Sequence, residues 1–119
     1  MTLKRVVVTG LGALTPIGNT VEEFWNGLSN GVSGCDFITR FDATNFKTRF
    51  ACEVKNFNPE NFMERKEARK MDRFAQFASV TTDEAIKDSG IDLEKINKTK
   101  IGVIWGSGIG GLTSFFNES

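Results

Sequence analysis

Two glycine-rich segments hold the residues most able to contact a ligand through the backbone. In each, an apolar run ends in spaced glycines, at residues 5–18 and 101–111. Glycine lacks a Cβ, so another backbone or a phosphate group can approach it closely. From Gly106 to Gly111 the spacing is Gly-x-Gly-x-x-Gly, but a dinucleotide site also needs a following helix, a second strand and an acidic residue about 20 positions on. For this turn, tight packing is the favoured interpretation and cofactor binding is less favoured. Backbone contact with a phosphate or pantetheine group ranks between the two.

A cluster of cations is the second feature with chemical meaning. It consists of Arg65, Lys66, Arg69, Lys70 and Arg73. In a helix predicted over residues 66–88, these cations share the arc opposite the apolar stripe. A charge run usually marks a solvated face. Cations in the first turns of a helix, however, oppose its dipole by about 0.3–1 kcal/mol for those nearest the end. This placement favours the docking of an anionic partner.

The sequence lacks the residues for a complete set of acid–base groups. It contains no histidine, which excludes Ser-His and Cys-His pairs and the commonest transition-metal ligand. We therefore expect no metal site and no resident cofactor. The two cysteines, Cys35 and Cys52, form no spaced motif. We expect them to be reduced, small and buried rather than joined in a disulfide.

The composition is that of one globular domain at most. The chain has 119 residues, and 15 basic residues balance 15 acidic ones, so no net field favours nucleic acid or an anionic membrane. No apolar run approaches the roughly 20 residues of a membrane span, and the first strand is too short for a signal-peptide core. We expect a cytoplasmic protein.

Local signals predict an α/β arrangement. Two buried strands are expected, over residues 6–9 and 101–105. Thr20 and Glu23 form a capping box at the start of a helix that turns Phe24, Trp25 and Leu28 inward. Further elements are a short strand over residues 49–54, a helical turn after Asn58-Pro59, and a helix over residues 66–88 stopped by Ser89-Gly90. Two strands and one helix cannot shield both faces of a parallel sheet, so we expect a piece of a larger fold.

Several segments together resemble a known family. They are Arg5-Val6-Val7-Val8-Thr9-Gly10-Leu11-Gly12, Thr15-Pro16-Ile17-Gly18-Asn19-Thr20, Phe41-Asp42, Arg65-Lys66-Glu67-Ala68-Arg69-Lys70-Met71-Asp72, and Gly106-Ser107-Gly108-Ile109-Gly110-Gly111-Leu112. In this order they resemble the N-terminal part of the β-ketoacyl-acyl carrier protein synthases, and most closely the synthase II branch of bacterial type II fatty-acid synthesis. The resemblance covers essentially all 119 residues.

The resemblance implies a thiolase-like α/β fold with a mixed sheet and covering helices, incomplete over residues 1–119. It also implies a homodimer that condenses acyl and malonyl thioesters of acyl carrier protein, with loss of carbon dioxide. The family's nucleophilic cysteine and two histidines have no counterpart here, and neither Cys35 nor Cys52 inherits the role, so the isolated chain is expected to be inactive. By resemblance, Lys66, Arg69 and Lys70 belong to the carrier-docking surface, and Gly108 and Ile109 to the acyl pocket.

An alternative from a different class stays open at this point. A small independent α/β module could use the glycine turn to bind a phosphate-bearing ligand. Aromatic residues beside that turn, Phe115 and Phe116, could line an apolar pocket, although simple packing is the favoured interpretation. A longer native sequence with a cysteine and two histidines would support the synthase instead.

Overall fold

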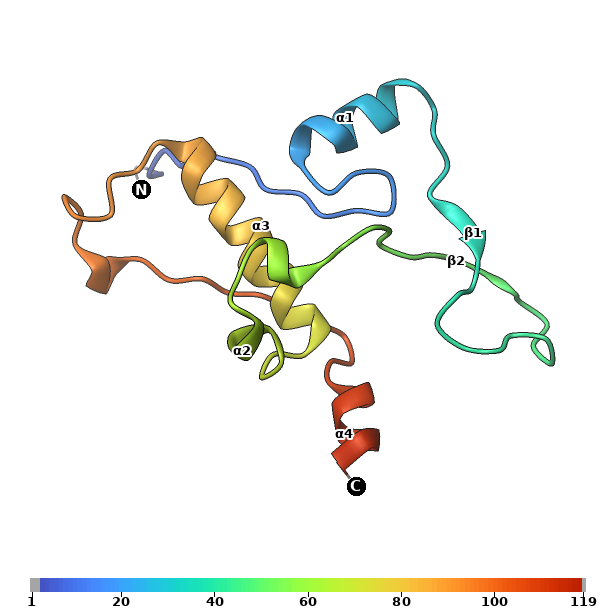
Figure 1. Cartoon of the computed structure of the whole chain (residues 1–119). Helices are drawn as coiled ribbons and strands as arrows, with labels where there is room; N and C mark the ends of the chain where they lie inside the picture. The colour runs from blue at the N-terminus through green and yellow to red at the C-terminus, as the bar shows by residue number, and fades with distance from the viewer. Residues whose placement is uncertain (1–2, 119) are drawn as a thin grey trace.

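Helix α3 (Arg73–Ser89) is the longest element, and the other segments are arranged around it (Figure 1). The computed structural model describes residues 3–118. A two-stranded antiparallel sheet of β1 (Cys35–Phe37) and β2 (Phe50–Cys52) lies to one side. The remaining elements are α1 (Val21–Ser29), the short 3-10 turns η1 (Pro59–Asn61) and η2 (Lys98–Lys100), α2 (Arg65–Ala68) and α4 (Leu112–Glu118).

The predicted helix over residues 66–88 is wrong in one respect, because the structure divides it into α2 and α3. The two helices are separated by residues 69–72. The Gln76 side chain donates hydrogen bonds to the carbonyl oxygens of Ala68, at 2.7 Å, and Met71, at 3.2 Å. These bonds satisfy carbonyl groups that a continuous helix would have bonded internally. The predicted stop is confirmed, since Gly90 ends α3 with a left-handed φ of 65°.

The capping of α1 follows the prediction and Phe24 is half-buried, but Trp25 and Leu28 are not turned inward. The Thr20 side chain accepts a hydrogen bond from the backbone N–H of Glu23 at 3.1 Å, and the Glu23 carboxylate accepts one from Asn19 at 2.7 Å. Trp25 is 63% exposed and Leu28 is also exposed, contrary to the expected inward orientation. No described layer covers that side of the helix.

The segment around the cysteines is a β-hairpin. Its second strand lies within the predicted strand over residues 49–54, and its first strand was not predicted. Cys35 and Cys52 are both free, as expected, but both are exposed rather than buried. The sheet is two strands wide, and five of its six residues are exposed among the described residues.

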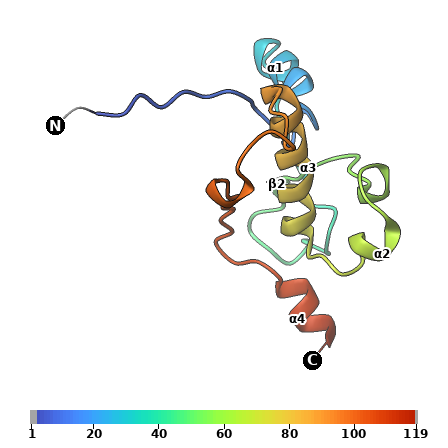
Figure 2. The ribbon, with the colours of Figure 1, turned by 90° about the vertical axis from the view of Figure 1, so that its left-hand side faces the viewer.

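The two predicted strands over residues 6–9 and 101–105 are not formed among the described residues. Both segments are unpaired, and Val6 and Ile104 are 91% and 98% exposed. Figure 2 shows the N-terminal segment projecting away from α3. A strand is defined by hydrogen bonds to a neighbouring strand, and neither segment lies beside one in residues 3–118. Their apolar sequences therefore lack the sheet that would bury them.

The dimensions of the chain agree with this lack of a covering layer. The radius of gyration is 17.6 Å, whereas a compact chain of this length has roughly 13.5 Å. The accessible surface is 10170 Å², compared with about 6400 Å² for a folded monomer of this mass. Much apolar surface is thus available for packing against further protein.

Candidate functional site

The first glycine-rich segment is held against α3 by close backbone packing. A Cβ on Gly12 would lie closer than 3.0 Å to the carbonyl oxygen of Thr81, and a Cβ on Gly10 equally close to that of Ala85. Neither backbone carbonyl can move without disturbing α3. The favoured interpretation, that glycines permit tight packing, is confirmed for Gly10 and Gly12.

Two carboxylates on α3 fix the same segment by accepting backbone hydrogen bonds. Glu84 accepts from the N–H groups of Ala13, at 2.8 Å, and Val21, at 2.9 Å. Asp88 accepts from the N–H of Leu11 at 2.9 Å. Glu84 thereby connects the glycine segment to the first residue of α1. The sequence indicated only that acids occur along this helix, and nothing in the spacing identified their backbone partners.

A cavity of about 350 Å³ lies between α3 and the two unpaired apolar segments. Its lining includes the α3 residues Thr82, Ala85 and Ile86, together with residues 103–105. No ionisable side chain lines it. The cavity therefore offers apolar packing and backbone contacts, not acid–base chemistry.

The second glycine-rich segment has two different halves. A Cβ added at Gly106 or Gly108 would meet open space. At Gly110 a Cβ would lie 2.7 Å from the Phe74 ring, and Gly111 has a positive φ of 73°. Ile109, assigned by resemblance to the acyl pocket, is 77% exposed. This segment thus places Ile109 at the surface of the described chain, beside the beginning of α3.

The turn is attached to α3 through Asp72, the residue preceding the helix. The Ser114 hydroxyl donates a hydrogen bond to the Asp72 carboxylate. The backbone N–H of Phe115 donates to the Gly111 carbonyl at 2.9 Å, which begins α4. These hydrogen bonds therefore link the turn to the start of α3 and to the start of α4.

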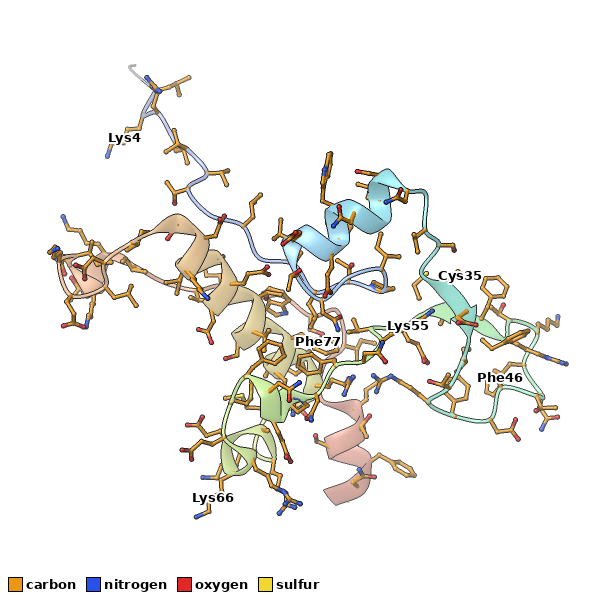
Figure 3. All side chains as sticks on the ribbon, turned by 45° about the horizontal axis from the view of Figure 1, so that its top comes forward. Lys4, Cys35, Phe46, Lys55, Lys66 and Phe77 are labelled. Carbon is orange, nitrogen blue, oxygen red and sulfur yellow. The ribbon has the colours of Figure 1, made fainter. Side chains whose placement is uncertain are left out.

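The candidate docking residues lie on α2 and on the bend that joins α2 to α3. Lys66, Arg69 and Lys70 are all exposed, and no ion pair joins them to an acid among residues 3–118. Figure 3 shows the Lys66 side chain pointing away from the rest of the molecule. The neighbouring Arg65 differs, because it pairs with Glu60 at 3.4 Å. Three cations of the cluster are thus free to meet an external anion.

The predicted dipolar cost of this cluster is wrong for Arg69. The prediction places the cations in the first turns of one long helix. In the structure α2 has only four residues, and Arg69 is its C-terminal cap. A cation at a helix C-terminus interacts favourably with the dipole, so Arg69 carries no dipolar cost there. The case for docking now depends on exposure and the absence of ion pairs.

Arg73 separates from the cluster and packs inward. Its guanidinium lies 5.3 Å from the centre of the Phe57 ring and 5.1 Å from that of Phe77. Its Nε atom is buried and has no hydrogen-bond partner among the described residues. Desolvation lowers the pKa of Arg73, and the positive charge of Arg40 lowers it further. Arg73 therefore stabilises the aromatic contacts and does not contribute to the exposed basic surface.

The described residues contain no group of three histidine, cysteine, aspartate or glutamate side chains able to hold a metal ion. Over the same part of the chain, no helix is both long and apolar enough to cross a bilayer. The geometry offers surfaces and a supporting helix rather than a set of reacting groups.

Comparison with known families identifies the class of protein to which this arrangement belongs. The model of the family described as "Beta-ketoacyl synthase, N-terminal domain" matches residues 3–118. The chain belongs to this family. Its fold is the thiolase-like α/β fold of ketosynthases, of which the structure shows a part.

Individual relatives agree with this assignment. The chain is 52% identical to 3-oxoacyl-acyl-carrier-protein synthase 2 of Synechocystis sp. over 109 residues, which are 92% of this chain and 26% of that protein. The proteins of the same name from Staphylococcus aureus (strain COL) and Vibrio cholerae are 50% and 52% identical over 112 residues, 94% of this chain and 27% of each relative.

A solved structure is also similar. The ishigamide ketosynthase/chain length factor superposes with a TM-score of 0.68 at 37% identity, covering 76% of this chain and 22% of that one. The chain therefore spans about a quarter of the length of the relatives it matches.

Proposed function

We propose that this chain is the N-terminal part of a β-ketoacyl-acyl carrier protein synthase, a cytoplasmic homodimer that elongates fatty acids. In the proposed reaction, malonyl-acyl carrier protein loses carbon dioxide, and the resulting carbanion attacks the thioester carbonyl of the acyl chain. A carbon–carbon bond forms, the acyl carbon–sulfur bond breaks, and the sulfur leaves as a thiolate that takes up a proton. The observation that carries the proposal is identity of 50–52% over 92–94% of the chain to relatives named 3-oxoacyl-acyl-carrier-protein synthase 2.

In this proposal, residues of this chain support the fold and recognise the carrier. Residues elsewhere in a longer protein form the new bond. The chain has no histidine, and its cysteines lie on an exposed hairpin rather than at the α3 cavity. The nucleophile and its partners must then come from other segments. The uncovered apolar surfaces support this division, because they leave room for those segments to pack.

Condensation assays of two lengths of the protein test whether bond formation needs residues outside this chain. The complete gene product and the 119-residue chain are each assayed with acyl- and malonyl-acyl carrier protein, following release of carbon dioxide and formation of the β-ketoacyl product. We expect turnover only from the complete protein. Turnover by the 119-residue chain would contradict the division, and a complete protein without condensing activity would contradict the proposed function.

We propose that Lys66, Arg69 and Lys70 dock the acidic acyl carrier protein. Support comes from their exposure, their proximity on one turn and bend, and the absence of ion pairs to described acids. Complementary charge accelerates encounter and fixes orientation, and it weakens with salt beyond a Debye length of about 8 Å. Docking here would place the carrier beside the glycine turn that bears Ile109.

A charge reversal with a matched control tests the docking surface. In the complete enzyme, Lys66→Glu with Arg69→Glu should raise the KM for carrier-bound substrate about tenfold, as expected when charge pairs worth about 1.4 kcal/mol are lost. The control, Lys47→Glu with Lys100→Glu, changes the net charge equally at exposed positions outside the surface. It should leave that KM within twofold.

A substrate that lacks the carrier separates docking from folding. The KM for a short acyl-pantetheine thioester should be the same in the wild type and both double variants. Equal losses with both substrates, or a carrier KM that does not change with added salt, would show that the basic surface is structural.

A further inference from the structure

The β-hairpin places the only two cysteines of this chain directly opposite each other. The register of β1 and β2 pairs Cys35 with Cys52, Asp36 with Ala51, and Phe37 with Phe50. Side chains that are directly opposite in an antiparallel pair lie on the same face of the sheet. The two thiols, which are 17 positions apart in sequence, are therefore neighbours in space.

The hydrogen-bond pattern identifies the kind of pair. The N–H of Ile38 donates to the carbonyl oxygen of Arg49 at 3.0 Å, just beyond the Phe37–Phe50 pair. Bonded and non-bonded pairs alternate along an antiparallel ladder, which makes Cys35 and Cys52 a non-hydrogen-bonded pair with Cα atoms about 4.5 Å apart. A disulfide requires Cα atoms about 4.4–6.8 Å apart. The backbone thus already has a separation that a disulfide can bridge.

Side chains outside the ladder hold this register. Lys55 forms an ion pair with Asp36 at 3.1 Å, and the Thr39 hydroxyl donates to the Glu53 carboxylate at 2.6 Å. The hydrogen bond from Lys55, followed by that from the Phe37 N–H, lowers the pKa of Asp36, in keeping with its ion pair across the hairpin. Each contact joins a residue of the first strand region to one of the second. A slip of either strand would break both contacts and separate the cysteines.

Both thiols are also accessible. Cys35 and Cys52 are free and exposed, and Figure 3 shows Cys35 at the end of β1 nearest α1. We propose that Cys35 and Cys52 form a reversible cross-strand disulfide by exchange with a low-molecular-weight disulfide of the glutathione type. The proposal does not depend on the proposed enzymatic function, because it uses neither the α3 cavity nor the basic surface.

The exchange is balanced in two steps. One cysteine loses its proton and attacks a sulfur of oxidised glutathione; a protein–glutathione S–S bond forms, the original S–S bond breaks, and one glutathione leaves as a thiolate that takes up a proton. The second cysteine then loses its proton and attacks the protein sulfur of the mixed disulfide, releasing the second glutathione. Two protein thiols are oxidised, and one small disulfide is reduced to two thiols.

Position and exposure make the resulting bond a switch rather than a permanent crosslink. It would close the open end of the hairpin and fix the segment between residues 35 and 52. Exposed disulfides have more oxidising potentials than buried structural ones, so cellular thiols reduce them readily. A rise in oxidised glutathione would thus stiffen this hairpin, and its fall would release it.

Peptide mapping of the complete protein after treatment with oxidised glutathione tests the proposal. We expect one peptide pair linked through Cys35 and Cys52, short of two hydrogen atoms, and reversed by dithiothreitol. The resolving thiol is held at an effective concentration in the millimolar range or higher. The linkage should therefore form at least about tenfold faster in the native protein than in urea-unfolded protein, where the register is lost.

Two matched variants distinguish exchange within the hairpin from independent reaction of each cysteine. Cys35→Ser and Cys52→Ser should each accumulate one stable glutathione adduct on the remaining cysteine, which the wild type should resolve. Stable adducts on both cysteines of the native wild type would overturn the proposal. So would thiols that stay unreacted in the native protein, or a linkage that forms at the same rate before and after unfolding.

Discussion

The two glycine-rich segments look alike in sequence but differ in why they need glycine. Gly10 and Gly12 lie against the backbone of α3, where a Cβ would collide with carbonyl oxygens. Gly106 and Gly108 face open space among the described residues. The first segment thus needs glycine because of a neighbour distant in the sequence. The second meets a neighbour only at Gly110, where a Cβ would lie 2.7 Å from the Phe74 ring, and it needs a left-handed backbone at Gly111, whose φ is 73°.

A run of spaced glycines thus predicts backbone freedom, but it does not predict which contact or conformation requires that freedom. In the first segment the freedom is consumed by packing, and Glu84 and Asp88 then fix the segment with backbone hydrogen bonds. In the second, Ile109 is exposed, next to Gly110, which lies against the Phe74 ring. One segment is therefore expected to determine stability and the other substrate recognition.

The largest expected effect comes from adding one methyl group to the first segment. Gly12→Ala should lower the free energy of unfolding by about 3 kcal/mol, the upper part of the range for overpacking, because the colliding atom is a helix backbone oxygen. Gly108→Ala should change it by less than about 0.5 kcal/mol. Urea unfolding of the complete protein measures both. Equal costs would show that the second segment is packed as tightly as the first.

The next effect removes the carboxylate that fixes the first segment. Glu84→Ala should cost about 2–3 kcal/mol of stability, because two backbone N–H groups lose a charged acceptor. The matched control is Asp83→Ala, at an exposed position one residue earlier. It should change stability by less than about 0.5 kcal/mol. Similar values for the two variants would mean that water replaces the Glu84 carboxylate without loss.

A smaller effect is expected at the strained position of the second segment. Gly111→Ala should cost about 1 kcal/mol, because alanine rarely adopts the left-handed region. Gly111→Asn should recover part of that cost, since asparagine tolerates this conformation. Thermal unfolding of the two variants compares them directly. If Asn and Ala are equally destabilising, contact with Asp72 rather than backbone strain explains the glycine.

The smallest effect on stability and the most selective effect on activity are expected at Ile109. Ile109→Phe adds volume at an exposed side chain, so the unfolding midpoint should change little. If Ile109 borders the acyl pocket, kcat/KM should fall for long acyl primers and stay unchanged for short ones, with Ile109→Leu as the conservative control. Equal loss at all primer lengths would remove Ile109 from the pocket.

Local chemistry made part of the fold predictable. The Thr20 cap, the Asn58-Pro59 turn and the Gly90 stop each depend on residues within one helical turn, and all three are confirmed. The strand over residues 50–52 was also located. Such features need no distant partner, so the sequence contains their full physical cause.

Features that depend on distant residues were not predictable in the same way. The bend between α2 and α3 is stabilised by the Gln76 side chain, which bonds to carbonyl groups five and eight residues earlier. The apolar runs at residues 6–9 and 101–105 have strand sequences, but a strand forms only beside another strand. The positions of Lys66, Arg69 and Lys70 were predicted as a cluster, whereas the inward packing of Arg73 between Phe57 and Phe77 was not.

The uncovered apolar segments beside α3 have a consequence for biosynthesis. In the synthase proposed above this part is N-terminal, so nearly three-quarters of a chain of the relatives' length would be translated after it. At about 5–20 residues per second, that synthesis takes on the order of 15–60 s. Until the segments that would cover them are made, Val6 and Ile104 have no neighbouring strand. We expect nascent chains to be substrates of ribosome-associated chaperones during that interval.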